Sequence, residues 1–130
     1  MTHEEINKKI AELKGECWHE PEYQTFEREG VKYRGSICKN CGKHKPLNFS
    51  NTDYAGDISK AWNLWNEMAE WCKENNGYMT FRAHANGRSG VSLYKDAPMV
   101  LDRVLLASAT ANTSEKAISL AYIRFMEGKG

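Results

Sequence analysis

The apolar residues of the chain recur at helical spacing in three segments, at 3–14, about 58–74 and 113–127. The first segment opens with Thr2 and Glu5 at the spacing of a capping box, in which each side chain accepts a hydrogen bond from the other residue's backbone N–H. Gly15 follows the segment and suits a left-handed helix exit. The pattern therefore predicts a short amphipathic helix at the amino terminus.

The strongest helical pattern begins after Asp57, a residue type that caps helices, and is expected to end at the sequence Asn75-Asn76-Gly77. Its apolar side chains fill about half of the helix circumference. The last helix is expected to start at Asn112, with Glu115 three positions later, and to stop at Gly128. All three helices should therefore bury one face against other elements.

Alternating patterns predict two hairpins. The stretch 22–37 has aromatic and β-branched residues on both sides of Gly30, and the stretch 78–94 carries the turn sequence Asn86-Gly87. In the second hairpin Met79, Phe81 and Ala83 should face inward. Residues 45–57 are rich in turn formers and predict an irregular connection. Residues 99–111 fit helix or strand, and their second half favours a strand because a helix start follows it.

The composition describes a globular chain of 130 residues with a formal net charge of +1. A balance this close to zero gives no global attraction to nucleic acid or to anionic membranes. The amino terminus carries charges where a signal peptide would be apolar, and no run approaches the roughly 18 apolar residues of a membrane span. We therefore expect a cytoplasmic protein without a membrane partner, in which the four cysteines stay reduced.

Four residues predict a zinc site. Cys17 and His19 lie in a segment expected to be extended, where residues two apart project to the same side. The hairpin then returns the chain to Cys38 and Cys41, and Gly42 supplies the backbone freedom of a tight C-x-x-C-G turn. Three thiolates and one imidazole suit Zn²⁺, and four protein ligands leave no position for water. Such a site is structural.

Other interpretations of these residues stay open. His44 could replace His19 as the fourth ligand, since C-x-x-C-x-x-H also fits zinc knuckles. If the two histidines coordinated in turn, zinc-bound water could act in hydrolysis, with Glu20, Glu22 or Glu27 as a base. The C-x-x-C pair could also be a redox couple or a pair of inert thiols. Cys72 lies on an apolar helix face and is expected to be a core thiol.

Two groups of basic residues could bind anions. Between residues 28 and 45 six basic residues accompany one acidic residue, so Arg34, Lys39 and Lys43 could contact nucleic acid. They could equally offset the charge of the zinc thiolates and keep an exposed ribbon in solution. In the second hairpin Arg82 and His84 alternate with the inward residues. Together with Arg88, across the turn, they could hold a phosphate or a small anionic nucleotide, or form an ordinary solvated sheet surface.

The long helix has apolar residues at the edge of its inward face. Leu64 and Trp71 lie at this margin, where a single sheet would cover them only in part. We therefore expect that the chain associates with itself as a homo-oligomer.

Two stretches carry a resemblance to a known family. The stretch "NTDYAGDISKAWNLWNEM" and the stretch "ASATANTSEKAISLAYIRFM", following "CWHE" and "CKNCGK", resemble the small bacteriophage proteins of the ABA-sandwich type, in the subset that carries zinc. The positions that match are Asn51, Asp53, Tyr54, Trp62, Met68, Ala107, Ala109, Ala117, Ile118 and Ala121. Thr52 stands where proline is usual in that family. The resemblance implies a phage or prophage origin and brings no activity with it.

The resemblance also implies an α+β fold with helices on both sides of a small antiparallel sheet. We expect one domain over residues 1–130, in which a zinc-ribbon-like hairpin at 15–45 is inserted between the first helix and a sandwich core at 46–130. No Ser/His/Asp set, Walker loop or HExxH motif occurs in the sequence. We therefore expect a non-enzymatic binding protein with structural zinc, acting on a host or defence factor in the host cytoplasm. Nucleic-acid binding and sequestration of a small anion are the alternatives, ahead of a zinc hydrolase.

Overall fold

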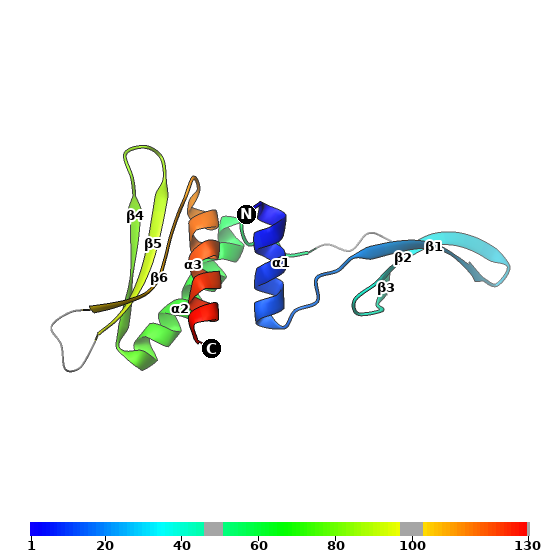
Figure 1. The fold of residues 1–130 in the computed structure, drawn as a ribbon. Helices are drawn as coiled ribbons and strands as arrows, with labels where there is room; N and C mark the ends of the chain where they lie inside the picture. Colours follow the sequence, from blue (N-terminus) through cyan, green and yellow to red (C-terminus); the bar gives the residue numbers. More distant parts are fainter. Residues whose placement is uncertain (46–50, 97–102, 130) are drawn as a thin grey trace.

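The computed structural model describes residues 1–45, 51–96 and 103–129, which form three α-helices and two three-stranded antiparallel sheets (Figure 1). The elements in chain order are α1 (His3–Lys14), β1 (Pro21–Arg28), β2 (Val31–Cys38), β3 (His44–Lys45), α2 (Ile58–Asn75), β4 (Gly77–Ala83), β5 (Ser89–Asp96), β6 (Arg103–Ala111) and α3 (Ser114–Lys129). The α+β class is as expected. Among the described residues, no helix is both long and apolar enough to cross a bilayer.

The three helices and the sheet β4-β5-β6 form the body of the protein (Figure 1). Helices α2 and α3 pack on each other and cover one face of the sheet, and α1 packs on the far side of α3. In the described part of the chain no helix covers the other sheet face, so the expected arrangement of helices on both sides is not confirmed. The physical reason is that much of this outer face carries polar side chains, such as Thr80, Ser92 and Ser108, which need no apolar cover.

The caps of the first two helices follow the sequence signals. Thr2 Oγ1 accepts a hydrogen bond from Glu5 N at 3.2 Å, and Gly15 closes α1 with a φ of 73°. Asp57 caps α2 by accepting from Ser59 N at 2.9 Å. Each of these interactions satisfies a helix-terminal N–H or C=O group that would otherwise lack a partner.

The boundaries of α3 differ from the expected ones. Thr113, and not Asn112, caps the helix, because Lys116 N donates to Thr113 Oγ1 at 3.3 Å. The helix also continues through Gly128 to Lys129. A glycine ends a helix when it adopts a left-handed conformation, and Gly128 does not adopt one.

The core lies between the helices and the inner face of the body sheet. Its largest fully buried side chains include Ile6, Ile10, Leu64, Met68, Val91, Leu93, Ile118 and Tyr122. The buried residues that β6 contributes to this face are alanines, at Ala107, Ala109 and Ala111, so α3 can approach the sheet closely. Asn7 is a buried polar residue whose amide donates to Asp53 Oδ1 and accepts from Ala55 N, both at 2.8 Å.

Strand β4 forms one edge of the body sheet, and the helices cover it only in part. Met79 and Phe81 pair with the buried residues Leu93 and Val91, so they point toward the helices as expected. Met79 packs against the core, but Phe81 is 42% exposed and Ala83 is exposed as well. The outer half of this edge strand thus faces inward but extends beyond the part of the sheet that the core covers.

The first three strands form a second sheet, here called the ribbon, which projects away from the body (Figure 1). Strands β1 and β2 pair along their whole length from Pro21–Cys38 to Arg28–Val31. Glu29 and Gly30 form the turn with φ values of 53° and 78°, which a two-residue hairpin turn requires. The short strand β3 was not expected; its second residue, Lys45, is the first residue of the region interpreted as irregular, of which residues 46–50 fall outside the described part.

Candidate metal centre

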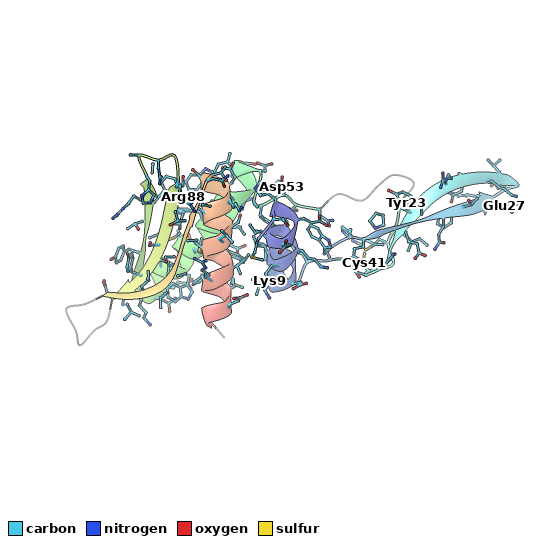
Figure 2. The ribbon with its side chains drawn as sticks, turned by 45° about the horizontal axis from the view of Figure 1, so that its top comes forward. Lys9, Tyr23, Glu27, Cys41, Asp53 and Arg88 are labelled. Carbon is cyan, nitrogen blue, oxygen red and sulfur yellow. The ribbon has the colours of Figure 1, made fainter. Side chains whose placement is uncertain are left out.

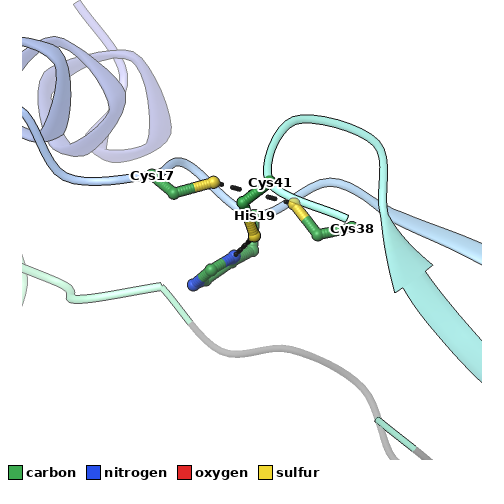
Figure 3. A group of neighbouring side chains, drawn as sticks. All are labelled: Cys17, His19, Cys38 and Cys41. Atoms are coloured by element: carbon green, nitrogen blue, oxygen red, sulfur yellow. Dashed lines mark hydrogen bonds between the residues drawn. The ribbon is translucent and has the colours of Figure 1, made fainter. Parts of the chain in front are cut away.

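The four predicted metal ligands meet where the ribbon joins the body (Figure 3). After α1 ends, an extended segment carries Cys17 and His19 into β1. Cys38 is the last residue of β2, and Cys41 lies in the turn that follows. Gly42 adopts a φ of 73° in this turn and donates from its N–H to the Cys38 carbonyl at 2.9 Å. The turn holds both sulfurs toward the incoming chain.

Two distances between ligand atoms match a tetrahedral zinc site. Cys17 Sγ lies 3.7 Å from Cys38 Sγ, and a tetrahedron with Zn–S bonds of about 2.3 Å requires about 3.8 Å. Cys41 Sγ lies 3.6 Å from His19 Nδ1, and the mixed S–Zn–N edge requires about 3.6 Å. All four ligand atoms lie within 4.8 Å of one another. The sulfurs are too far apart for a disulfide, whose S–S bond is about 2.05 Å.

Hydrogen bonds hold the ligand-bearing segments in place. The Asn51 side chain accepts from His19 N at 2.8 Å and donates to His19 O at 3.0 Å. Asn40 Nδ2 donates to Trp18 O, and Lys39 N donates to Glu20 O at 2.9 Å. The segment at 17–20 is thus tied both to the turn at 38–41 and to the chain beyond the ribbon. Sequence reasoning missed these asparagines, because an amide that bonds to backbone has no characteristic spacing.

The environment of the cluster favours one thiolate even without a cation. Burial opposes ionisation of Cys38, which is 1% exposed, but hydrogen bonds from the backbone of Cys41 and Asn40 and from His19 lower its pKa to about 5. Burial and hydrogen bonds to Cys41 and Cys38 raise the pKa of Cys17 to about 12. A divalent cation would favour ionisation of all three thiols.

The other candidate ligands lie elsewhere or are not described. His44 lies in β3, where its backbone pairs with Ile37 of β2. The His44 side chain falls outside the described residues, so its role as an alternative ligand stays open. Cys72 is 6% exposed on α2 within the core, and burial raises its pKa. It is a core thiol, as expected.

The candidate bases lie in different places. Glu20 forms an ion pair with Lys8 at 3.5 Å. Glu22 and Glu27 lie on β1, opposite Ile37 and Lys32. A cavity of about 220 Å³ borders Cys17 and His19, and Glu16 is the carboxylate on its wall. Glu16 accepts a hydrogen bond from Tyr54 Oη at 2.7 Å. Glu16 and Glu20 are thus both engaged in polar contacts.

The β1–β2 hairpin of the ribbon contains as many acidic as basic residues. Within β1, its turn and β2, three basic residues accompany three acidic ones: Arg28, Lys32, Arg34, Glu22, Glu27 and Glu29. Lys39 and Lys43 lie in the turn beside the metal ligands. Figure 2 places Cys41 between α1 and the ribbon, with Tyr23 and Glu27 further along the ribbon. The acidic residues of β1 were outside the sequence window that suggested a positive patch.

The second group of basic residues is divided by the hairpin of the body sheet. Arg82 and His84 line a cavity on the outer sheet face, whereas Arg88 lies at the turn and does not line it (Figure 2).

Two residues of α2, Leu64 and Trp71, suggested self-association. Leu64 is 0% exposed within the single chain. Trp71 is partly buried and packs edge-on against Phe125 at a centroid distance of 5.3 Å. Leu64 therefore offers no surface to a second copy, and the expected homo-oligomer stays a prediction.

The comparisons with known proteins found no matching family model, no matching curated protein and no matching solved structure. The site is therefore defined by its geometry alone, as a candidate Cys₃His centre for a divalent cation.

Proposed function

We propose that this protein is a non-enzymatic binding protein in which a structural zinc ion fixes the ribbon to the body, so that the ribbon can contact a protein partner. The convergence of Cys17, His19, Cys38 and Cys41 on one point supports this function. When bound, zinc would neutralise the thiolates and cross-link the two segments that carry them. Four protein ligands complete its usual coordination, which disfavours catalysis.

The need for a metal follows from how little the ribbon buries. Strands β1 to β3 pack substantially only on one another among the described elements. Most residues of β1 and β2 are exposed, and a small sheet of this kind is marginally stable in water by itself. A zinc site contributes folding free energy directly. We infer that the metal replaces the apolar core that the ribbon lacks.

The exposed side chains of the ribbon support a protein as the partner. Val31 is 65% exposed, Tyr33 is 36% exposed, and the rings of Phe26 and Tyr33 stack with centroids 5.6 Å apart. Paired residues share a face, so Phe26, Tyr33, Arg28 and Val31 lie together on one side of the ribbon. Aromatic residues and arginine are enriched at protein interfaces.

The charge of the ribbon separates the two kinds of partner. A nucleic-acid surface needs an excess of cations to displace counterions from phosphates. The β1–β2 hairpin has equal numbers of acidic and basic residues, and the excess of basic residues lies at Lys39, Lys43 and Lys45, beside the metal ligands. There the zinc thiolates would offset part of the positive charge. The nucleic-acid alternative, which relies on Arg34, Lys39 and Lys43, therefore receives less support than a protein partner.

The resemblance to phage ABA-sandwich proteins suggests where a partner would be found. A chain of phage or prophage origin would meet host proteins, including defence factors, in the host cytoplasm. We therefore propose a bacterial host protein as the partner.

A photo-crosslinking experiment in zinc-loaded protein tests this function. A photoreactive phenylalanine at Tyr33 should capture a discrete host protein, whereas the same group at Trp62, which is 42% exposed on α2, should not. Chelation of zinc should abolish capture at Tyr33, because the ribbon would lose its fixed orientation. Capture that survives chelation, or equal capture from both positions, would contradict the proposal.

A further inference from the structure

The outer face of the body sheet contains a polar cavity, at the opposite end of the molecule from the ribbon (Figure 1). It encloses about 220 Å³, which is below the roughly 300–1,000 Å³ of pockets for drug-sized ligands. The side chains that give it its chemistry are Thr80, Arg82, His84, Ser92, Ser108 and Thr110. The cavity is not part of the metal centre.

The strand register brings these residues into two adjacent rows across the sheet. The first row is Thr80–Ser92–Ser108, and the second is Arg82–Gly90–Thr110. The first row aligns three hydroxyl groups, each of which can donate a hydrogen bond. The second row places a guanidinium and a further hydroxyl on either side of a glycine.

Gly90 creates the hollow between the two edges of the sheet. A Cβ atom at this position would lie 3.1 Å from His84 Nε2 and 3.7 Å from Thr110 Oγ1. The absence of a side chain therefore lets the imidazole lie over the central strand, close to the hydroxyl of the third strand. Both groups border the same small volume.

The charge of the cavity is positive and has no counter-charge. Neither Asp nor Glu is among the described residues that line it. Arg82 forms no ion pair with the described part of the chain. A guanidinium is suited to two parallel hydrogen bonds with an oxyanion, and the surrounding hydroxyls could donate to its other oxygens.

An aromatic surface borders the cavity. Tyr94 lines it and stacks on Tyr78 with ring centroids 5.0 Å apart and an interplanar angle of 12°. A flat aromatic surface beside an oxyanion site could accept the sugar or base attached to a phosphate.

We propose that this cavity binds the phosphate group of a small phosphate monoester. Arg82 would form the charge-assisted contacts, His84 and the threonine and serine hydroxyls would complete the donor set, and Tyr94 would contact the rest of the molecule. This site would act independently of the zinc-fixed ribbon, so the failure of either proposal would leave the other intact.

Titration of zinc-loaded, full-length protein tests the site, followed by amide chemical shifts and calorimetry. The probes are inorganic phosphate, ribose 5-phosphate, adenosine 5′-monophosphate and adenosine. The three phosphate-containing probes should cause saturable shifts in β4, β5 and β6, and adenosine should cause none. Tighter binding of the nucleotide than of inorganic phosphate would assign a role to Tyr94, and equal binding would assign the site to the phosphate alone. Equal binding of adenosine and its monophosphate, or no saturable shift with any probe, would overturn the proposal.

Two arginine variants provide a matched comparison. Arg82→Gln should weaken phosphate binding about tenfold or more, because it removes hydrogen bonds to a charged group. Arg88→Gln makes the same change in net charge outside the cavity and should leave the affinity within about twofold. Both side chains are exposed, so the amide spectrum of each variant should show an intact fold. An equal loss in both variants would indicate general surface attraction and would overturn the assignment.

Discussion

Tyr122 of α3 donates its hydroxyl hydrogen to Glu67 Oε2 of α2 at 2.7 Å, and the same carboxylate accepts an ion-pair contact from Lys14 of α1 through Oε1. One carboxylate thus joins all three helices. Tyr122 is 1% exposed, and the Lys14 ammonium lies 5.8 Å from the centre of its ring. This polar contact lies beside the apolar core and connects the helix that leads into the metal centre to the rest of the body.

The first prediction concerns alkaline pH. Burial and the hydrogen bond to Glu67 raise the pKa of Tyr122, and burial and Glu16 raise that of Tyr54, above the ordinary value of about 10. Each tyrosine keeps its proton longer in the folded state than in the unfolded state, so its contribution to stability is complete below pH 10 and is lost as the pH rises further. Urea unfolding at a series of pH values should show a decline that begins near pH 10.

Removal of one hydroxyl provides the check. Tyr122→Phe should lower the free energy of unfolding by about 1 kcal/mol at neutral pH and reduce the decline at alkaline pH. Tyr23→Phe changes a tyrosine of the ribbon that is 57% exposed, and it serves as the control for loss of a phenol. If Tyr122→Phe had the same alkaline decline as the unmodified protein, the Tyr122–Glu67 contact would not explain it.

Local signals made the helices and hairpins predictable. Thr2 with Glu5, Asp57 and the Asn86-Gly87 turn each act within a few residues, and the structure contains the corresponding caps and turn. The order of layers is a global property. It depends on which faces need apolar cover, and the outer sheet face is polar at positions such as Thr80 and Ser92. The resemblance therefore gave the α+β class but not the arrangement of the helices.

The metal centre was predictable for a different reason. Thiol and imidazole side chains at such short spacing are typical of zinc sites, and the four residues expected to converge do lie together. The distribution of charge over the ribbon was less predictable, because charges were counted along the chain. Antiparallel pairing places Glu27 directly opposite Lys32 and brings acidic residues of β1 beside the basic ones of β2.

The second prediction concerns metal stoichiometry. Native mass spectrometry should detect one zinc ion per chain, because the four ligand atoms form a single cluster. Cys41→Ser should lower the zinc affinity by more than about 100-fold, since loss even of a hydrogen bond to a ligand costs about 10–100-fold. Cys72→Ala removes a thiol from the core and should retain one zinc ion. Full zinc occupancy in Cys41→Ser at limiting metal would argue against the assigned ligand set.

The third prediction concerns removal of the metal. Chelation should increase amide hydrogen exchange throughout β1 and β2, which have little apolar contact beyond themselves, and should leave β5 and α3 protected. The body keeps its own core, so its thermal transition should persist. Hydrogen exchange followed by mass spectrometry resolves the two regions. Unchanged protection of the ribbon after complete chelation would show that the metal does not hold it.

The fourth prediction concerns the asparagine that holds His19. The two hydrogen bonds between the Asn51 side chain and the His19 backbone orient a ligand without touching the metal. Asn51→Ala should therefore weaken zinc binding by about 10–100-fold while all four ligands remain. Asn66→Ala on the exposed face of α2 is the matched control and should bind zinc as the unmodified protein does. Competition with a chromophoric chelator measures both affinities. Equal affinities in the two variants would mean that the Asn51 side chain is not needed to position His19.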